Sequence, residues 1–222
     1  MTRRRLVAIG AGGALVLVLA AVAWTQTRQD PAPIPSEITL VPSRTEVAAL
    51  DAARKDPLAA RLQGVLAQDP ATRPVLAQAA ASPVPVLAPS DPALLRTARL
   101  YSGTRHYMLV VQRGEQIIEI YGTTKAFQSP LARPLQPPGA VLTPPTRATR
   151  VAPATAALAR ARAQGLINIR TERTEYGVDV SFNRFGAAYS VSFICEGQGA
   201  PGCAEADALA FAASLQLIGG GA

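Results

Sequence analysis

Residues 167–195 read INIRTERTEYGVDVSFNRFGAAYSVSFIC, and this stretch decides the fold. Apolar and polar side chains alternate along three segments, which are separated by turn-like residues at 173–177 and 184–186. A period of two indicates β-strands with one buried face. We therefore predict a three-stranded antiparallel meander with strands at 167–172, 178–183 and 189–195.

Other regular elements surround this meander. Residues 153–164 predict a helix that is closed by Gly165, and residues 204–217 predict a final helix with one apolar stripe. Upstream, segments 106–111 and 116–121 flank a turn that contains Gly114, which predicts a β-hairpin. Because this hairpin carries apolar side chains on both faces, we expect it to be central in its sheet.

Short helices are predicted between residues 43 and 98. Residues 43–46, SRTE, match a capping box. Asp-Pro pairs at 56–57, 69–70 and 91–92 each predict a helix start, since aspartate caps well and proline suits the first turn. Pro74 should shorten or split the helix that follows the second pair, and residues 84–87 form a possible edge strand between prolines.

The N-terminus predicts membrane targeting. Arg3, Arg4 and Arg5 precede an uncharged apolar run over residues 6–24. As a helix this run spans about 28 Å, close to a hydrocarbon core of about 30 Å, and Trp24 lies where an interfacial aromatic would lie. Because arginines stay in the cytoplasm, we expect a single pass through the inner membrane with the body in the periplasm. A signal peptide cut near Ala23 is the alternative, and it leads to the same compartment.

The predicted organisation has five parts. Residues 1–28 are a signal-anchor or signal peptide, and 29–42 are a proline-bearing tether. Residues 43–125 carry the helices and the hairpin, 126–150 are a Pro-rich linker, and 151–222 carry the meander and its helices. The fold class is therefore α+β, arranged as two small lobes or as one mixed domain.

The net charge of +7 suggests nucleic acid at first sight, but its distribution does not. Four of the 22 basic residues flank the leader, namely Arg3, Arg4, Arg5 and Arg28. The remainder holds 18 basic against 15 acidic residues, which is nearly neutral. We expect no nucleic-acid partner.

Cys195 and Cys203 are the only cysteines, and a flexible, glycine-rich segment separates them. In an oxidising compartment such a pair is expected to form a structural disulfide. A redox pair would favour C-x-x-C spacing, and a metal site would need histidines nearby.

No pattern commits the chain to catalysis. His106 is the only histidine, and the sequence holds neither a G-x-S-x-G nor an S-x-x-K motif, so we interpret His106 as an ordinary strand residue. Two acidic pairs, Glu115 with Glu119 and Glu172 with Asp179, are interpreted as solvated side chains. We expect no enzyme, no cofactor and no metal.

A polar surface of the meander is the candidate binding site. We expect Arg170, Arg173 and Arg184 to gather with Tyr176 on its open face. With the tether and the disulfide, this favours a membrane-anchored, non-enzymatic binding or assembly component of the cell envelope with a protein partner. The alternatives are a periplasmic module that binds a small ligand between its lobes and an enzyme acting on cell wall or glycan.

Overall fold

The structure is a computed structural model that describes residues 36–128, 153–195 and 202–221. The predicted leader, most of the tether and residues 129–150 of the predicted linker lie outside these ranges. Within the described ranges, no helix is long and apolar enough to cross a bilayer, and the apolar run 6–24 is not among them.

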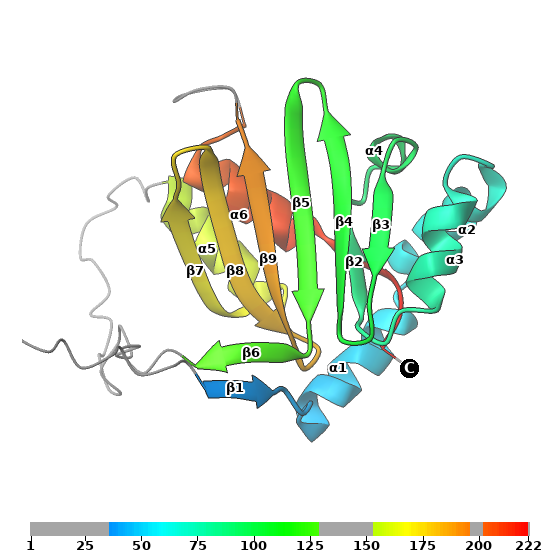
Figure 1. The fold of residues 1–222 in the computed structure, drawn as a ribbon, viewed down its shortest axis with the longest axis horizontal. Helices are drawn as coiled ribbons and strands as arrows, with labels where there is room; N and C mark the ends of the chain where they lie inside the picture. Colours follow the sequence, from blue (N-terminus) through cyan, green and yellow to red (C-terminus); the bar gives the residue numbers. More distant parts are fainter. Residues whose placement is uncertain (1–35, 129–152, 196–201, 222) are drawn as a thin grey trace, which may run out of the picture. The chain divides into compact units, whose positions relative to one another are not determined.

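One antiparallel sheet of six strands organises the described residues, in the order β3-β4-β5-β9-β8-β7 (Figure 1). The fold is α+β, as predicted. Strand β5 pairs with β9, so the predicted hairpin and the predicted meander belong to one sheet. The strands are β3 (Arg99–Ser102), β4 (His106–Arg113), β5 (Gln116–Thr123), β7 (Ile167–Arg173), β8 (Gly177–Arg184) and β9 (Ala187–Ile194).

The meander is confirmed, and its alternation sets its buried face. Every second residue of β8 and β9 is buried against the helices, namely Val178, Val180, Phe182, Ala187, Tyr189, Val191 and Phe193. Strand β7 departs from the prediction at its start. Asn168 has a φ of 55°, and the β7–β8 register shifts between Ile167 and Arg170. This irregularity leaves Ile167 half exposed, although its place in the alternation predicted burial.

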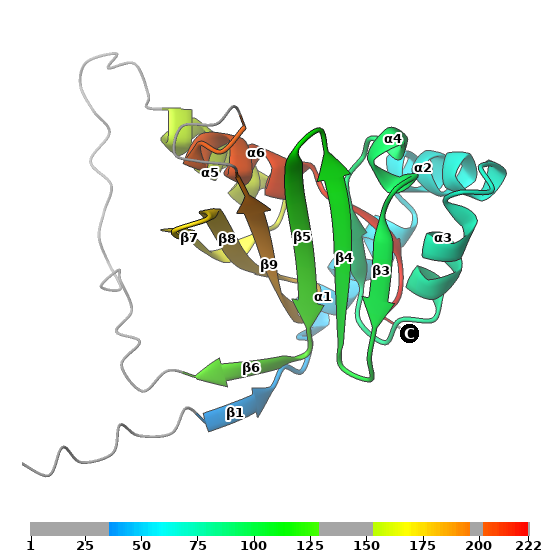
Figure 2. The same cartoon turned by 45° about the horizontal axis from the view of Figure 1, so that its top comes forward.

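Helices cover one face of the sheet and leave the other open (Figures 1 and 2). Helix α6 (Glu205–Ser214) contacts β8 and β9, and α5 (Pro153–Ala163) packs against α6. Towards the other edge, α3 (Arg73–Ala80) contacts β3, and α4 (Pro92–Leu95) contacts β4. Helix α2 (Pro57–Gln68) packs on α3, and α1 (Arg44–Arg54) packs on α2. We call the two sides the covered face and the open face.

The predicted helix starts are confirmed at three places and wrong at one. Ser43 and Glu46 form the capping box of α1, and Asp56 and Asp91 cap α2 and α4. Asp69 instead follows the end of α2, where its carboxylate accepts from the Ala71 amide at 2.9 Å and from the Arg96 side chain at 2.8 Å. These bonds favour a turn, so α3 starts only at Arg73. Pro74 therefore lies in the first turn of α3, where no helical hydrogen bond is lost, rather than splitting the helix.

Beneath the sheet lies a two-stranded pair that the sequence did not predict. Strand β2 (Val86–Ala88) is wholly buried and pairs with β10 (Gln216–Gly219). Residues 84–87 are thus part of the core rather than an exposed edge. The predicted helix 204–217 is correspondingly too long, because the chain leaves α6 after Ser214 and extends along β2. Backbone pairing with a buried strand satisfies groups that would otherwise lie unpaired in the core.

Two buried tyrosines attach β2 to the sheet. The Leu87 amide donates to the Tyr107 hydroxyl at 2.9 Å, and the Tyr189 hydroxyl donates to the Pro85 carbonyl at 2.9 Å. Gly122 lies opposite Tyr107 in the β4–β5 register, and a Cβ there would meet the Tyr107 ring. Burial raises the pKa of both tyrosines, since a phenolate would lose its hydration.

A second strand pair joins residues predicted as tether and linker. Strand β1 (Ser36–Thr39) runs antiparallel to β6 (Lys125–Gln128), and Lys125 forms an ion pair with Glu37. The end of the predicted tether and the start of the predicted linker therefore form regular structure. Four residues of mixed polarity give too short a pattern for either strand to be predicted.

Candidate functional site

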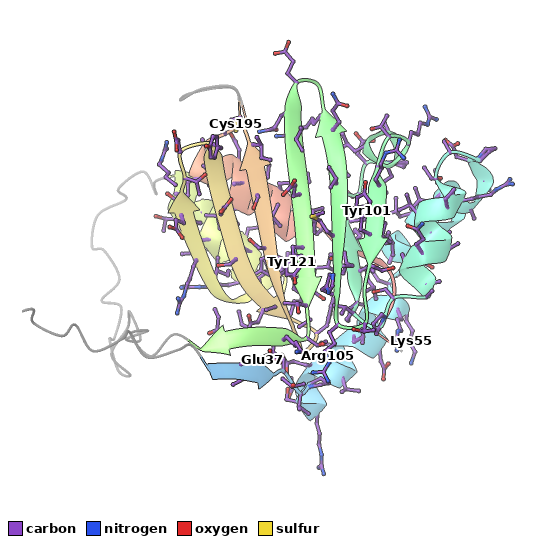
Figure 3. All side chains as sticks on the ribbon, viewed as in Figure 1. Glu37, Lys55, Tyr101, Arg105, Tyr121 and Cys195 are labelled. Atoms are coloured by element: carbon purple, nitrogen blue, oxygen red, sulfur yellow. A yellow bond between two sulfur atoms is a disulfide. The ribbon has the colours of Figure 1, made fainter. Side chains whose placement is uncertain are left out.

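The open face of the sheet carries an apolar surface. Tyr101, Met108 and Tyr121 are direct neighbours across β3, β4 and β5. Tyr101 is 54 % exposed and Tyr121 is 39 % exposed, and Figure 3 shows both on the side of the sheet that faces the viewer. A second row pairs Ile117 with Ile194 across β5 and β9. We define the aromatic patch as Tyr101, Met108, Val110, Ile117, Tyr121 and Ile194.

His106 borders the aromatic patch. Its ring stacks on the Tyr121 ring with centroids 5.9 Å apart. Gly103, in the turn before β4, leaves room for this ring, since a Cβ on Gly103 would lie 2.5 Å from the imidazole Cε1. The histidine is exposed and lies against an aromatic ring rather than beside a nucleophile. Its position extends the patch towards the β3–β4 turn.

The open face of the meander has a different chemistry. Ser190 of β9 lies directly beside Tyr121 of β5, and Ser181 of β8 lies directly beside Ser190. Two residues along each strand, Glu119 of β5 lies beside Ser192 of β9, which lies beside Asp179 of β8. Asp179 in turn lies beside Glu172 of β7. Apart from Ile194, small hydroxyl side chains thus replace the large apolar ones within one strand spacing.

The four predicted binding residues are not brought together. Arg170 lies on the open face next to Ser181, and Tyr176 is exposed in the β7–β8 turn. Arg173 lies at the far end of β7, two residues after Thr171, whose hydroxyl donates to Glu205 of α6 on the covered face. Arg184 comes two residues after buried Phe182 in β8, so its side chain also lies on the covered face.

Arg184 lies in a partly buried position. Its guanidinium carbon is 4.6 Å from the centre of the Phe185 ring, and its Nη1 donates to the Leu215 carbonyl at 3.2 Å. Burial is the main influence on this side chain and lowers the pKa of its guanidinium, opposed by the Tyr189 side chain and by the carboxylate of Asp56. A charge in this setting is costly unless an anion is near.

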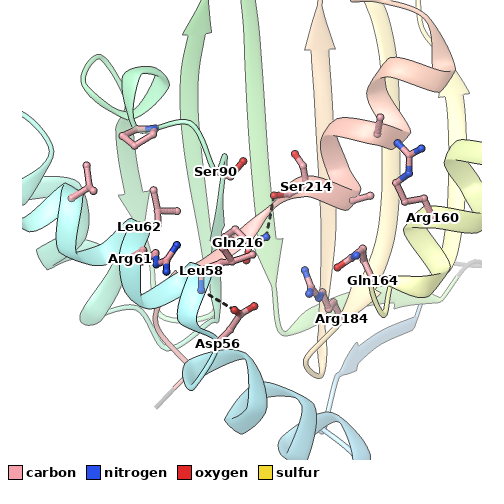
Figure 4. A pocket seen from close by; sticks show the side chains of 14 residues that line it. Asp56, Leu58, Arg61, Leu62, Ser90, Arg160, Gln164, Arg184, Ser214 and Gln216 are labelled. Atoms are coloured by element: carbon pink, nitrogen blue, oxygen red, sulfur yellow. Dashed lines mark hydrogen bonds between the residues drawn. The ribbon is translucent and has the colours of Figure 1, made fainter.

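Two adjoining clefts meet at Arg184. The first, the arginine cleft, measures about 700 Å³ and is bordered by the side chains of α2, α5, α6 and β10 (Figure 4). The second, the apolar groove, measures about 890 Å³ and runs between α1 and the start of β7. Asp56, Gln164 and Arg184 line both clefts. Volumes of this size are typical of sites for small organic ligands.

The predicted disulfide is confirmed. Cys195 and Cys203 are bonded, with their Cα atoms 6.5 Å apart. The bond connects the end of β9 to the residues that precede α6. Beside it, the Arg113 guanidinium lies 5.9 Å and 5.7 Å from the ring centres of Phe193 and Phe211. The bond therefore holds β9 next to α6, the helix that covers it.

Other candidate chemistry is sparse in residues 36–128, 153–195 and 202–221. These ranges contain no group of three histidine, cysteine or acidic side chains that would hold a metal ion. Glu115 lies in the β4–β5 turn, whereas Glu119 lies within β5 on the open face. Glu172 and Asp179 lie directly opposite each other across β7 and β8, on the open face.

The sequence prediction missed the aromatic patch and the two clefts. The outward apolar residues of β4 and β5 were visible, but they were interpreted as a sign of burial on both faces. The clefts combine residues more than one hundred positions apart, such as Arg61 and Arg184, and no local pattern joins them. The chain matches no known protein-family model, no curated protein and no solved structure.

Proposed function

We propose that this chain is a non-enzymatic binding component of the cell envelope that docks a protein partner on the aromatic patch. The observation that carries the proposal is the set of large apolar side chains left exposed on the open face, of which Tyr101 is the most exposed. Contiguous exposed apolar surface is characteristic of interaction sites. Tyrosine and methionine are enriched at protein interfaces, and tyrosine supplies contact area with few rotatable bonds.

The charges around the patch favour a partner with an apolar, nearly neutral surface. Val110 lies between Arg99 and Glu119 in one row, so the nearest charges are of opposite sign and balance. A nucleic acid or an anionic membrane surface would call for several like positive charges instead. A protein surface matches this arrangement, in which apolar contacts surround a few isolated charges of opposite sign.

The proposed location is the periplasmic side of the inner membrane. Its supports are the arginine cluster with the apolar run 6–24 in the sequence, and the Cys195–Cys203 bond. Alkylation of free thiols in intact cells, before lysis, tests this proposal. We expect both cysteines to resist the reagent until a reductant is added. Full labelling without a reductant would contradict an oxidising compartment.

Site-specific photo-crosslinking in intact cells tests the docking surface. We expect a photoreactive amino acid at position 101 to form an adduct with another protein. The same amino acid at position 170 is the control, because Arg170 is also exposed on the open face but lies outside the patch. An absence of adducts at 101, equal adducts at both positions, or a dimer of this chain alone would each overturn the proposal.

A further inference from the structure

We infer that the arginine cleft and the apolar groove together bind an amphiphilic anion, a carboxylate or phosphate carried on an apolar chain. This site lies on the covered side of the sheet and is separate from the aromatic patch. Three arginines line the arginine cleft from three elements: Arg61 from α2, Arg160 from α5 and Arg184 from β8. Side chains from separate elements converge on one cleft, as they do in binding sites.

The charge balance of the arginine cleft is positive. Among the described residues that line it, Asp56 is the only one with a carboxylate, against three guanidinium groups. One oxygen of Asp56 already accepts from the Leu58 amide at 2.8 Å, as the N-cap of α2. Figure 4 shows Arg184 between Asp56 and Gln164, with the side chains of Arg61 and Arg160 further along the rim. The cleft therefore offers more positive charge than its own acid neutralises.

Arg184 has unused donors at the junction of the two clefts. Among the described residues its guanidinium makes one hydrogen bond, to Leu215, and no ion pair. A guanidinium has five N–H donors in a planar fork that matches the two oxygens of a carboxylate or phosphate. Stacking on Phe185 fixes the plane of this fork. Burial lowers the pKa of Arg184, although the nearby Asp56 carboxylate opposes this without forming an ion pair with it, and a bound oxyanion would supply a directly paired charge.

The apolar groove fits the apolar chain of the proposed ligand. Its wall surface is mostly apolar, with Ala49, Ala52 and Ala53 of α1 on one side and Ile167 and Phe185 on the other. Its charged residues are balanced, since Glu46 and Asp56 stand against Lys55 and Arg184. Glu46 is also engaged: it accepts from the Ser43 amide and hydroxyl, both at 2.8 Å, and from the Gly186 amide at 3.2 Å. These bonds keep the pKa of Glu46 low, so this carboxylate already has its partners within the protein.

The two halves define one ligand chemistry. An apolar chain in the groove would place its charged end at the junction of the two clefts, where Arg184 lies with Asp56 and Gln164. An uncharged chain would leave the guanidinium without its anion, and a bare anion would leave the groove empty. Either part alone should therefore bind more weakly than the two joined.

Calorimetric titration of the full chain in nanodiscs tests this inference. The probes are octanoate and octyl phosphate, with octanol, octylamine and acetate as partial ligands, and empty nanodiscs are titrated to subtract partitioning. We expect octanoate or octyl phosphate to bind at least tenfold more tightly than each partial ligand. Equal binding of octanol, or of acetate, would overturn the inference.

Two variants link the binding to the cleft. We expect Arg184→Gln to weaken octanoate binding at least tenfold, and Arg160→Gln, at an exposed position of α5, to weaken it about threefold. Arg170→Gln on the open face is the matched control and should bind like the wild type. Because Arg160 is exposed, its variant remains informative if Arg184→Gln fails to fold. Unchanged affinity in Arg160→Gln together with an unchanged or unfolded Arg184→Gln would contradict the assignment.

Discussion

The two halves of the sheet have the same topology and different surfaces. The hairpin half, β3 to β5, and the meander half, β7 to β9, each run from an edge strand to the centre, where β5 meets β9. On the covered face both halves present apolar side chains, and each contributes one tyrosine that holds β2. On the open face Tyr121 and Ser190 are direct neighbours, yet one is large and aromatic and the other is small and polar.

This contrast separates what the fold requires from what it leaves free. Positions on the covered face must fill a common core, so both halves are alike there. Positions on the open face are not needed for packing, because the serines of the meander half serve as well as the tyrosines of the hairpin half. This difference supports our proposal that the aromatic side chains of the hairpin half serve binding.

The largest expected effect concerns the covered face, where the halves should behave alike. We expect Leu109→Ala to cost about 2–5 kcal/mol and Phe193→Ala about 3–5 kcal/mol, because each truncation leaves a cavity in the shared core. Urea denaturation of the full chain, followed by circular dichroism, measures both. Both variants should unfold in one transition, as one continuous core requires. Two separate transitions would show that the halves are independent units.

The disulfide belongs to the meander half alone. Replacing both Cys195 and Cys203 by alanine should lower the free energy of unfolding by about 2–3 kcal/mol, the value expected for so short a loop. The same urea denaturation gives this value. Reductant should destabilise the wild type to a similar degree and leave the variant unchanged. An unchanged midpoint in the variant would mean that α6 stays on β9 without the bond.

The buried tyrosines link both halves to β2, and they predict a pH effect. Tyr107→Phe and Tyr189→Phe should each cost about 1–3 kcal/mol, because each leaves a buried backbone group of β2 unpaired. Burial raises the pKa of both phenols, so the unfolded chain loses these protons first, near pH 10, and stability falls as the pH rises further. Denaturation at pH 7 to 11 should show a flatter decline in the double variant. Equal slopes would contradict this origin.

The smallest effect on stability is expected on the open face. Tyr121→Ala and Ser190→Ala change neighbouring positions, and each should alter the free energy of unfolding by about 1 kcal/mol or less. Only Tyr121→Ala should reduce the crosslink formed from position 101. If Ser190→Ala reduced it equally, the partner would contact both halves, and the contrast between them would lose its functional meaning.

Much of this fold is visible in the sequence where the signal is local. Strands β8 and β9 were predicted because strict alternation continues up to a turn in which Phe185 and Gly186 both have positive φ. Counting by twos from Phe182 also places Arg184 on the covered face, so the signal that separates it from Arg170 was present and was misinterpreted.

The remaining features depend on partners distant in the sequence. Leu215 lies on the same helical stripe as Ala208 and Ala212, and only the buried strand β2 explains why the chain leaves the helix after Ser214. Likewise, Ile117 and Ile120 are similar residues in one strand, yet the first is 40 % exposed and the second is fully buried. Which of them is exposed depends on the elements that cover the sheet, and these come from both ends of the described chain.

The pairing of β2 with β10 has a consequence for biosynthesis. The two strands are about 130 residues apart, and elongation at roughly 5–20 residues per second separates their appearance by about 6 to 26 seconds. During that delay the apolar segment around Val86 has no backbone partner, and an unpaired apolar strand is prone to aggregate. A nascent chain of this protein should therefore depend on a holdase chaperone until residue 216 has been synthesised.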